Sequence, residues 1–155
     1  MKKIIVAASL LILVACKNQT AEVSIAPSVD DVKETKKPIE GTWKMVYGEI
    51  REKDSLQIKD LSNTSFIKII NASHFAFFNQ NTSGEANFYG GGGTYELNGD
   101  AYAETLSYTS VDGVRGHRFP FTVEFKGDTL IQYGLEEVKK ANIKRHIVEK
   151  YIRIE

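Results

Sequence analysis

The chain has 155 residues, with 20 basic and 20 acidic side chains and a formal net charge of zero at pH 7. This length bounds the folded part at one domain, and the balanced charge leaves no basic surplus for nucleic acid, which is excluded as a partner. The single cysteine cannot form an internal disulfide, so the domain must be held together by packing.

Residues 1–15 are typical of an export signal. Two lysines follow Met1, and residues 4–14 form an apolar run that is too short for a permanent membrane span. The tetrapeptide ending at Cys16 (LVAC) resembles the lipobox of bacterial lipoproteins. The resemblance implies cleavage before Cys16, acylation of its thiol and anchoring in a membrane. Because position 17 is not Asp, the same analogy favours the outer membrane. The alternative is an ordinary secretory peptide with a chance cysteine.

Residues 16–37 comprise Cys16 and a polar stretch with no sustained period. Such a composition predicts a disordered tether between the lipid and the folded domain. The domain itself is expected over residues 38–155, which is long enough for one compact core.

Period-two alternation and turn residues predict strands throughout the domain. The expected strands are Trp43–Ile50, Phe66–Ile70, His74–Phe78, Ala86–Leu97, Ala101–Thr109, His117–Phe125, Thr129–Tyr133 and Ile147–Ile154. Hairpin-length turns join nearly all of them, so we predict an all-β fold, a single antiparallel up-and-down β-barrel of about eight strands, because closure removes the exposed sheet edges. A two-sheet sandwich is the structural alternative. Arg51–Asn63 is expected to be a long polar connection, and Leu135–Arg145 to hold a helical turn or two.

Four consecutive glycines, Gly90–Gly93, interrupt the fourth expected strand. A phosphate-binding loop needs a following helix and a suitably placed lysine, and neither is present here. Glycine inside a strand marks a bulge, a bend or a close backbone approach, so we interpret the run as a bend that helps the barrel to close.

The dipeptide Asn98-Gly99 predicts a two-residue hairpin turn of type I′. In that register Gly93 faces Glu104, and one face of the hairpin carries the aromatic and apolar side chains, which we expect to point inward. The inward set that could orient the polar end of a ligand is Tyr95, Tyr102, Glu104 and Tyr108. Two alternatives remain open for Glu104: a hydrogen-bonded residue of a filled core, or a solvent-facing residue if the register slips.

The triplet Gly41-Thr42-Trp43 and the late basic residue Arg153 resemble the motifs that close one end of lipocalin-type barrels, where an arginine packs over the tryptophan. Together with the segment GGGGTYELNGDAYAETLSY, they are similar to the lipocalin-like domain of Bacteroidota lipoproteins. The resemblance covers residues 39–155 and implies a lipocalin-like barrel with a binding role. Lys139–His146 departs from it, being longer and more charged than expected.

No metal site, cofactor or catalytic centre is expected. The three histidines lie in separate segments without metal-ligand spacing, and no nucleophile motif occurs. We therefore expect a monomeric binding protein that is not an enzyme, is joined to the membrane through Cys16 and holds a small, largely apolar or amphipathic ligand inside the barrel, with Arg51–Asn63 as a lid. The alternative is a filled barrel that acts through its surface as an interaction or inhibitor module. The face of His74–Phe78 that points inward stays open.

Overall fold

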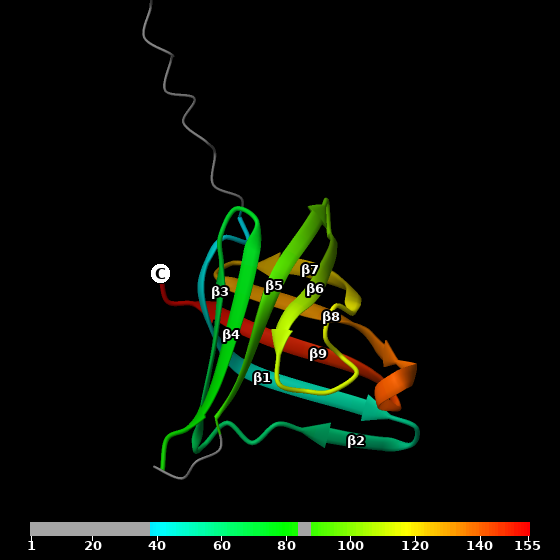
Figure 1. The fold of residues 1–155 in the computed structure, drawn as a ribbon. Coiled ribbons are helices and arrows are strands. Elements are labelled where there is room, and N and C mark those ends of the chain that lie inside the picture. The colour runs from blue at the N-terminus through cyan, green and yellow to red at the C-terminus, as the bar shows by residue number, and fades with distance from the viewer. Residues whose placement is uncertain (1–37, 84–87) are drawn as a thin grey trace, which may run out of the picture. The chain divides into compact units, whose positions relative to one another are not determined.

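A computed structural model of the protein describes residues 38–83 and 88–155, and nearly all of them lie in strands (Figure 1). The elements are β1 (Gly41–Glu52), β2 (Ser55–Ile58), β3 (Thr64–Ile70), β4 (His74–Asn81), β5 (Tyr89–Asn98), β6 (Ala101–Thr109), β7 (Arg118–Lys126), β8 (Thr129–Val138), the 3₁₀ turn η1 (Lys139–Ala141) and β9 (Ile143–Arg153). In this part of the chain no helix is long and apolar enough to cross a membrane.

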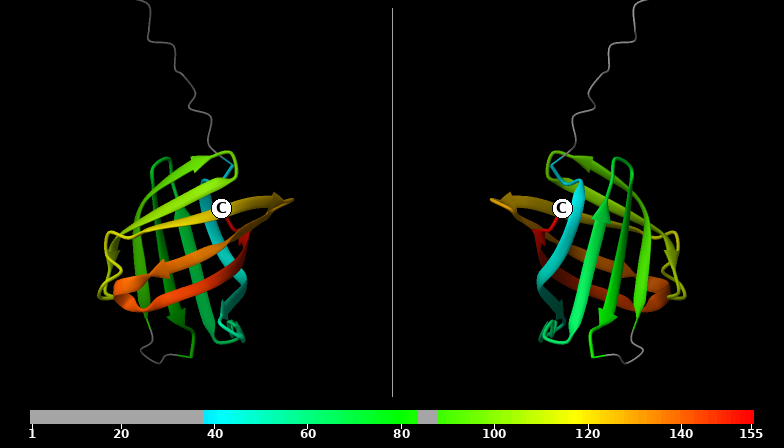
Figure 2. Two further views of the ribbon diagram at one scale, coloured as in Figure 1. Left: turned by 90° about the vertical axis from the view of Figure 1, so that its right-hand side faces the viewer. Right: turned by 90° about the vertical axis from the view of Figure 1, so that its left-hand side faces the viewer.

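Each of the strands β3 to β8 pairs antiparallel with the next one along the chain, β1 pairs with β3, and β9 returns to pair with β1. The result is a closed antiparallel barrel of eight strands with one added strand, β2, which pairs with the end of β1 (Figure 2). The predicted all-β barrel is confirmed, and the sandwich alternative is wrong, because a sandwich leaves sheet edges that this β1–β9 pairing removes.

Two segments fold differently from the prediction. Arg51–Asn63 is not one long connection, since β1 continues to Glu52 and turns back as β2, whose four residues are all exposed. Leu135–Arg145 is largely strand, and its helical content is the three residues of η1, followed by Asn142 in the left-handed conformation. Polar hairpins that extend past a barrel rim have no buried face, so their strand pattern is weak in the sequence.

One end of the barrel is closed by side chains, and we call it the closed end. Trp43 is 1% exposed and its indole nitrogen donates a hydrogen bond to the Ile39 carbonyl at 2.8 Å. The Arg153 guanidinium lies over the Trp43 ring at 4.1 Å and donates to the carbonyls of Glu40 and Pro38. The Trp–Arg contact is the one that the resemblance implied, and it fixes the start of the described chain against the last strand.

The opposite end of the barrel, which we call the mouth, is formed by the β6–β7 loop (residues 110–117), the η1 turn and the β1–β2 hairpin. The structure also shows which face of β4 points inward, a question that the sequence did not decide. Phe75 and Phe77 point into the barrel, whereas His74 and Phe78 are exposed on its outer surface.

Candidate functional site

The barrel interior is filled at the closed end but contains two adjoining cavities toward the mouth. The mouth cavity has a volume of about 210 Å³, and the inner cavity, deeper in the barrel, about 140 Å³. Apolar side chains dominate the first, among them Phe77, Leu106, Val111, Val114, Phe119, Phe121 and Ile143. Six residues line both cavities: Phe77, Tyr89, Glu104, Phe121, Glu136 and Arg145. A ligand entering from the mouth would therefore meet an apolar wall first and polar groups below it.

A buried ion pair lies at the base of the inner cavity. Lys68 on β3 is 2% exposed, and its ammonium group pairs with Glu104 on β6 and donates to Oε1 of Gln132 on β8 at 2.7 Å. The hydroxyl of Tyr102 donates to Glu104 at 2.9 Å. Rings of aromatic residues also surround the Lys68 ammonium, with their centroids 5.5–5.6 Å away (Phe75, Tyr102 and Tyr151). This pairing compensates two charges that would otherwise be costly to bury.

A second carboxylate, Glu149 on β9, is held by Lys59 at 2.8 Å and by the Tyr151 hydroxyl at 2.6 Å. The stem of Lys59 passes over Gly48, where an added Cβ would lie 2.5 Å from a Lys59 carbon, so the glycine leaves room for the lysine to reach inward. Burial raises the pKa of Glu149, but the nearby ammonium groups of Lys59 and Lys68 outweigh it and hold that pKa below its usual value. Burial opposes the charge on Lys59, yet Glu149 raises the pKa of Lys59 overall.

These shifts predict an acid-dependent stability. Because the folded-state pKa of Glu149 is depressed, its contribution is present above the usual pKa of 4.5 and is lost as the pH falls through the folded value. We expect the free energy of unfolding to fall between pH 6 and pH 3, measured by urea unfolding, and to fall less steeply in Glu149→Gln. Parallel profiles for the two proteins would contradict the assignment.

The contribution of Lys59 to stability has the opposite pH dependence: it is present below pH 10.5 and is lost as the pH rises through the raised pKa of Lys59.

A third ion pair joins Glu136 on β8 to Arg145 on β9 at 2.6 Å, where the two cavities meet. Burial raises the pKa of Glu136, and the neighbouring Arg145 opposes that rise without cancelling it. The pair is more accessible than the Lys68–Glu104 pair, with side chains 18% and 36% exposed.

The β5–β6 turn lies one residue later than predicted, at Gly99-Asp100, with Gly99 at φ +62°. This changes the pairing of the two strands by two residues, so Tyr95 rather than Gly93 is opposite Glu104. A two-residue shift preserves the faces, so Tyr95, Tyr102 and Glu104 still point inward. Glycine with positive φ in the first turn position is the pattern of a type II′ turn, which competes with type I′ for the same Asn-Gly-Asp sequence.

Tyr95 and Tyr102 lie below the cavities, toward the closed end. Their rings pack 5.5 Å apart, and the Tyr95 hydroxyl donates to the Asn71 carbonyl at 2.7 Å. Burial and then Glu104 raise the pKa of Tyr102 far above its usual range, so it stays a hydrogen-bond donor. Of the three inward residues Tyr95, Tyr102 and Glu104, Glu104 is the one that lines both cavities. Tyr102 lines neither cavity, but its hydroxyl donates the hydrogen bond to the Glu104 carboxylate.

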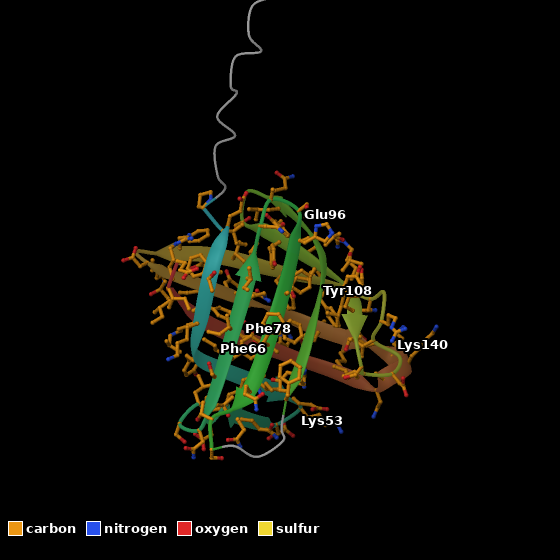
Figure 3. The ribbon with its side chains drawn as sticks, turned by 60° about the vertical axis from the view of Figure 1, so that its left-hand side comes forward. Lys53, Phe66, Phe78, Glu96, Tyr108 and Lys140 are labelled. Atoms are coloured by element: carbon orange, nitrogen blue, oxygen red, sulfur yellow. The ribbon has the colours of Figure 1, made fainter. Side chains whose placement is uncertain are left out.

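Tyr108 was expected inside the barrel, but the structure places it outside, 71% exposed. Gly92 pairs with Tyr108 and Gly93 with Leu106, so Ser107 is an extra residue that forms a β-bulge. A bulge reverses the faces beyond it. Tyr108 and Phe78, both labelled in Figure 3, therefore line an outer groove of about 660 Å³ over Gly90–Gly93.

Comparison with known proteins identifies the family. The family described as "Domain of unknown function (DUF4488)" matches residues 38–155, which span the whole described barrel. The chain belongs to this DUF4488 family. A solved structure described as an uncharacterized protein from Bacteroides eggerthii DSM 20697 is similar at 18% identity and a TM-score of 0.45, covering 72% of this chain and 98% of that one. The comparison with curated proteins found no match.

The remaining site predictions for this DUF4488 member concern lipid and metal. Cys16 lies outside the described residues. Within residues 38–83 and 88–155, no group of three or more His, Cys, Asp or Glu side chains could hold a metal ion. His74 lies at the closed end of β4, hydrogen-bonded to Ser73, and His117 packs on Phe119 beside the mouth.

Sequence reasoning missed most of the charged interior of the DUF4488 domain. A signal for part of it was present, because Lys68 alternates with Phe66 and Ile70, and Glu149 alternates with Ile147 and Tyr151. A charged residue in an apolar period-two set is either paired or functional. Lys59 gave no such signal, since it follows β2 and reaches the interior across Gly48.

Proposed function

We propose that the barrel binds a small amphipathic molecule in the mouth and inner cavities, without catalysis. The observation that carries the proposal is the uneven filling of the interior. The closed half is packed with large side chains such as Trp43 and Tyr102, while the half toward the mouth keeps cavities of about 210 and 140 Å³. Convergent polar groups in an otherwise apolar pocket are typical of ligand sites. Volumes of about 210 and 140 Å³ lie below the roughly 300–1,000 Å³ of pockets for drug-sized ligands, so the ligand is small.

The order of the linings supports one orientation for such a ligand. Its apolar part would lie against Phe77, Phe119 and Phe121 in the mouth cavity. Its polar end would reach the inner cavity, where Gln132 and the Lys68–Glu104 pair offer hydrogen-bonding atoms. The similarity of Gly41-Thr42-Trp43 and Arg153 to lipocalin motifs supports a binding role, and the proposal includes lipid anchoring through Cys16 at the outer membrane.

A bulky side chain at the mouth tests the proposal. Ile143 lines the mouth cavity and is only partly buried, so Ile143→Trp should fill space with little effect on folding. Native mass spectrometry of protein purified from its own source should detect a small molecule bound to the wild type, and the bound fraction should fall at least about tenfold in Ile143→Trp.

Ile152→Trp provides the matched control, because Ile152 is on the same strand but is exposed on the outer surface. It should keep wild-type occupancy. Equal loss in both variants, or no bound molecule in the wild type, would contradict interior binding.

A second function, association through the outer surface, is favoured by the aromatic groove over Gly90–Gly93. Phe78, Phe88 and Tyr108 are exposed there, and the Phe78 and Phe88 rings stack at 6.5 Å. Large exposed apolar patches mark interaction sites. If this groove carries the function, Tyr108→Ser should abolish recovery of a partner from the native envelope, whereas Ile143→Trp should leave it unchanged.

A further inference from the structure

The charged side chains that line the two cavities are matched in number and joined in pairs. Among the described lining residues, the cations are Lys59, Lys68 and Arg145, and the anions are Glu104, Glu136 and Glu149. Each cation contacts one anion through a bond already described: Lys59 with Glu149, Lys68 with Glu104, and Arg145 with Glu136. The lining therefore has no cation or anion left over for a charged ligand.

A ligand with a net charge would have to enter without a counter-ion or break one of these pairs. Either event leaves one charge uncompensated in a partly buried site, which is strongly unfavourable. An uncharged polar group meets no such cost, because hydroxyl and amide groups can bond to atoms that keep spare capacity, such as the amide of Gln132 and the carboxylate of Glu149.

We propose that the cavities select amphipathic ligands whose polar end is uncharged, such as an alcohol or amide, and reject those ending in a carboxylate or an ammonium. This inference rests on the proposed interior binding and adds the chemical class of the ligand. The Glu136–Arg145 pair is the one on which it can be tested, because it lies where the two cavities meet and is the most accessible of the three.

Three probes of equal chain length separate the classes: octan-1-ol, octanoate and octylamine. Calorimetric titration of the full chain at pH 8, where the last two are charged, should show octan-1-ol binding at least about tenfold more tightly than either ion. Binding of octanoate or octylamine to the wild type as tightly as octan-1-ol would overturn the inference and leave interior binding intact. No binding of any probe to the wild type or its variants would overturn the proposed function itself.

Single substitutions in the pair should convert the selectivity in a direction set by charge. Glu136→Gln leaves Arg145 without its partner, so octanoate should gain at least about tenfold and octylamine should not. Arg145→Gln leaves Glu136 alone, so octylamine should gain and octanoate should not. The Arg118–Glu96 pair, 2.8 Å apart on the exposed outer surface, gives matched controls, and Glu96→Gln and Arg118→Gln should change neither preference. If the two interior variants shift all three probes together, charge pairing does not control selection.

Discussion

Lys68→Met should lower the free energy of unfolding by about 3–5 kcal/mol, the typical cost of leaving a buried charge without its partner. Methionine fills a similar volume but cannot neutralise Glu104, which is 7% exposed. The Gln132 amide also loses its Lys68 donor. Urea unfolding of the full chain at pH 7 measures the difference.

The double variant Lys68→Met/Glu104→Gln shows whether the unpaired charge is the cause. Glutamine keeps an oxygen that can accept from the Tyr102 hydroxyl, so at least half of the lost stability should return. The exposed pair is the control, since Arg118→Gln should cost at most about 1 kcal/mol. If the double variant is less stable than Lys68→Met, the loss comes from packing around Lys68 rather than from charge.

Gly93→Ala should cost about 3 kcal/mol or more, even though it adds a single methyl group. The β-bulge at Ser107 brings the β6 backbone against Gly93, and an added Cβ would lie 1.8 Å from the Thr105 carbonyl oxygen. The obstacle is backbone, so no side-chain rotation can relieve it. Chemical unfolding of the purified variant measures the loss.

Gly90→Ala is the matched comparison from the same run of glycines. Its nearest atom would be the Phe77 carbonyl oxygen at 3.0 Å, a tight contact that a small shift can relieve. Because alanine also restricts the unfolded chain, the net change should stay within about 1 kcal/mol. Equal stability of Gly93→Ala and the wild type would mean that the bulge relaxes at no cost.

The barrel could be predicted because sequential antiparallel strands have a repeated local pattern in the sequence, in which apolar alternation is followed by turn residues. Closure of the sheet follows from the need to remove its exposed edges. The orientation of single residues depended on features with no local pattern. Tyr108 is outside because one extra residue, Ser107, changes the faces of β6, and alternation alone cannot show a bulge.

The candidate site was predicted in part for the same reason. Glu104 was located correctly on the inner face, since a two-residue shift of register preserves faces. Its partner Lys68 lies on a strand 36 positions earlier, and their meeting depends on how β3 and β6 face each other across the barrel. Such cross-barrel contacts need the number and tilt of all the strands, which no single segment of sequence contains.

The closed end also determines where this domain can be attached. Residue 37 joins the barrel at Pro38, whose carbonyl is held by Arg153 on the side away from the mouth. Any anchor upstream of Pro38 therefore connects to the closed end of the barrel rather than to the mouth. The proposed ligand entry and the proposed lipid anchor would therefore lie at opposite ends of the barrel, so a change in the mouth loops would alter the opening without altering the attachment.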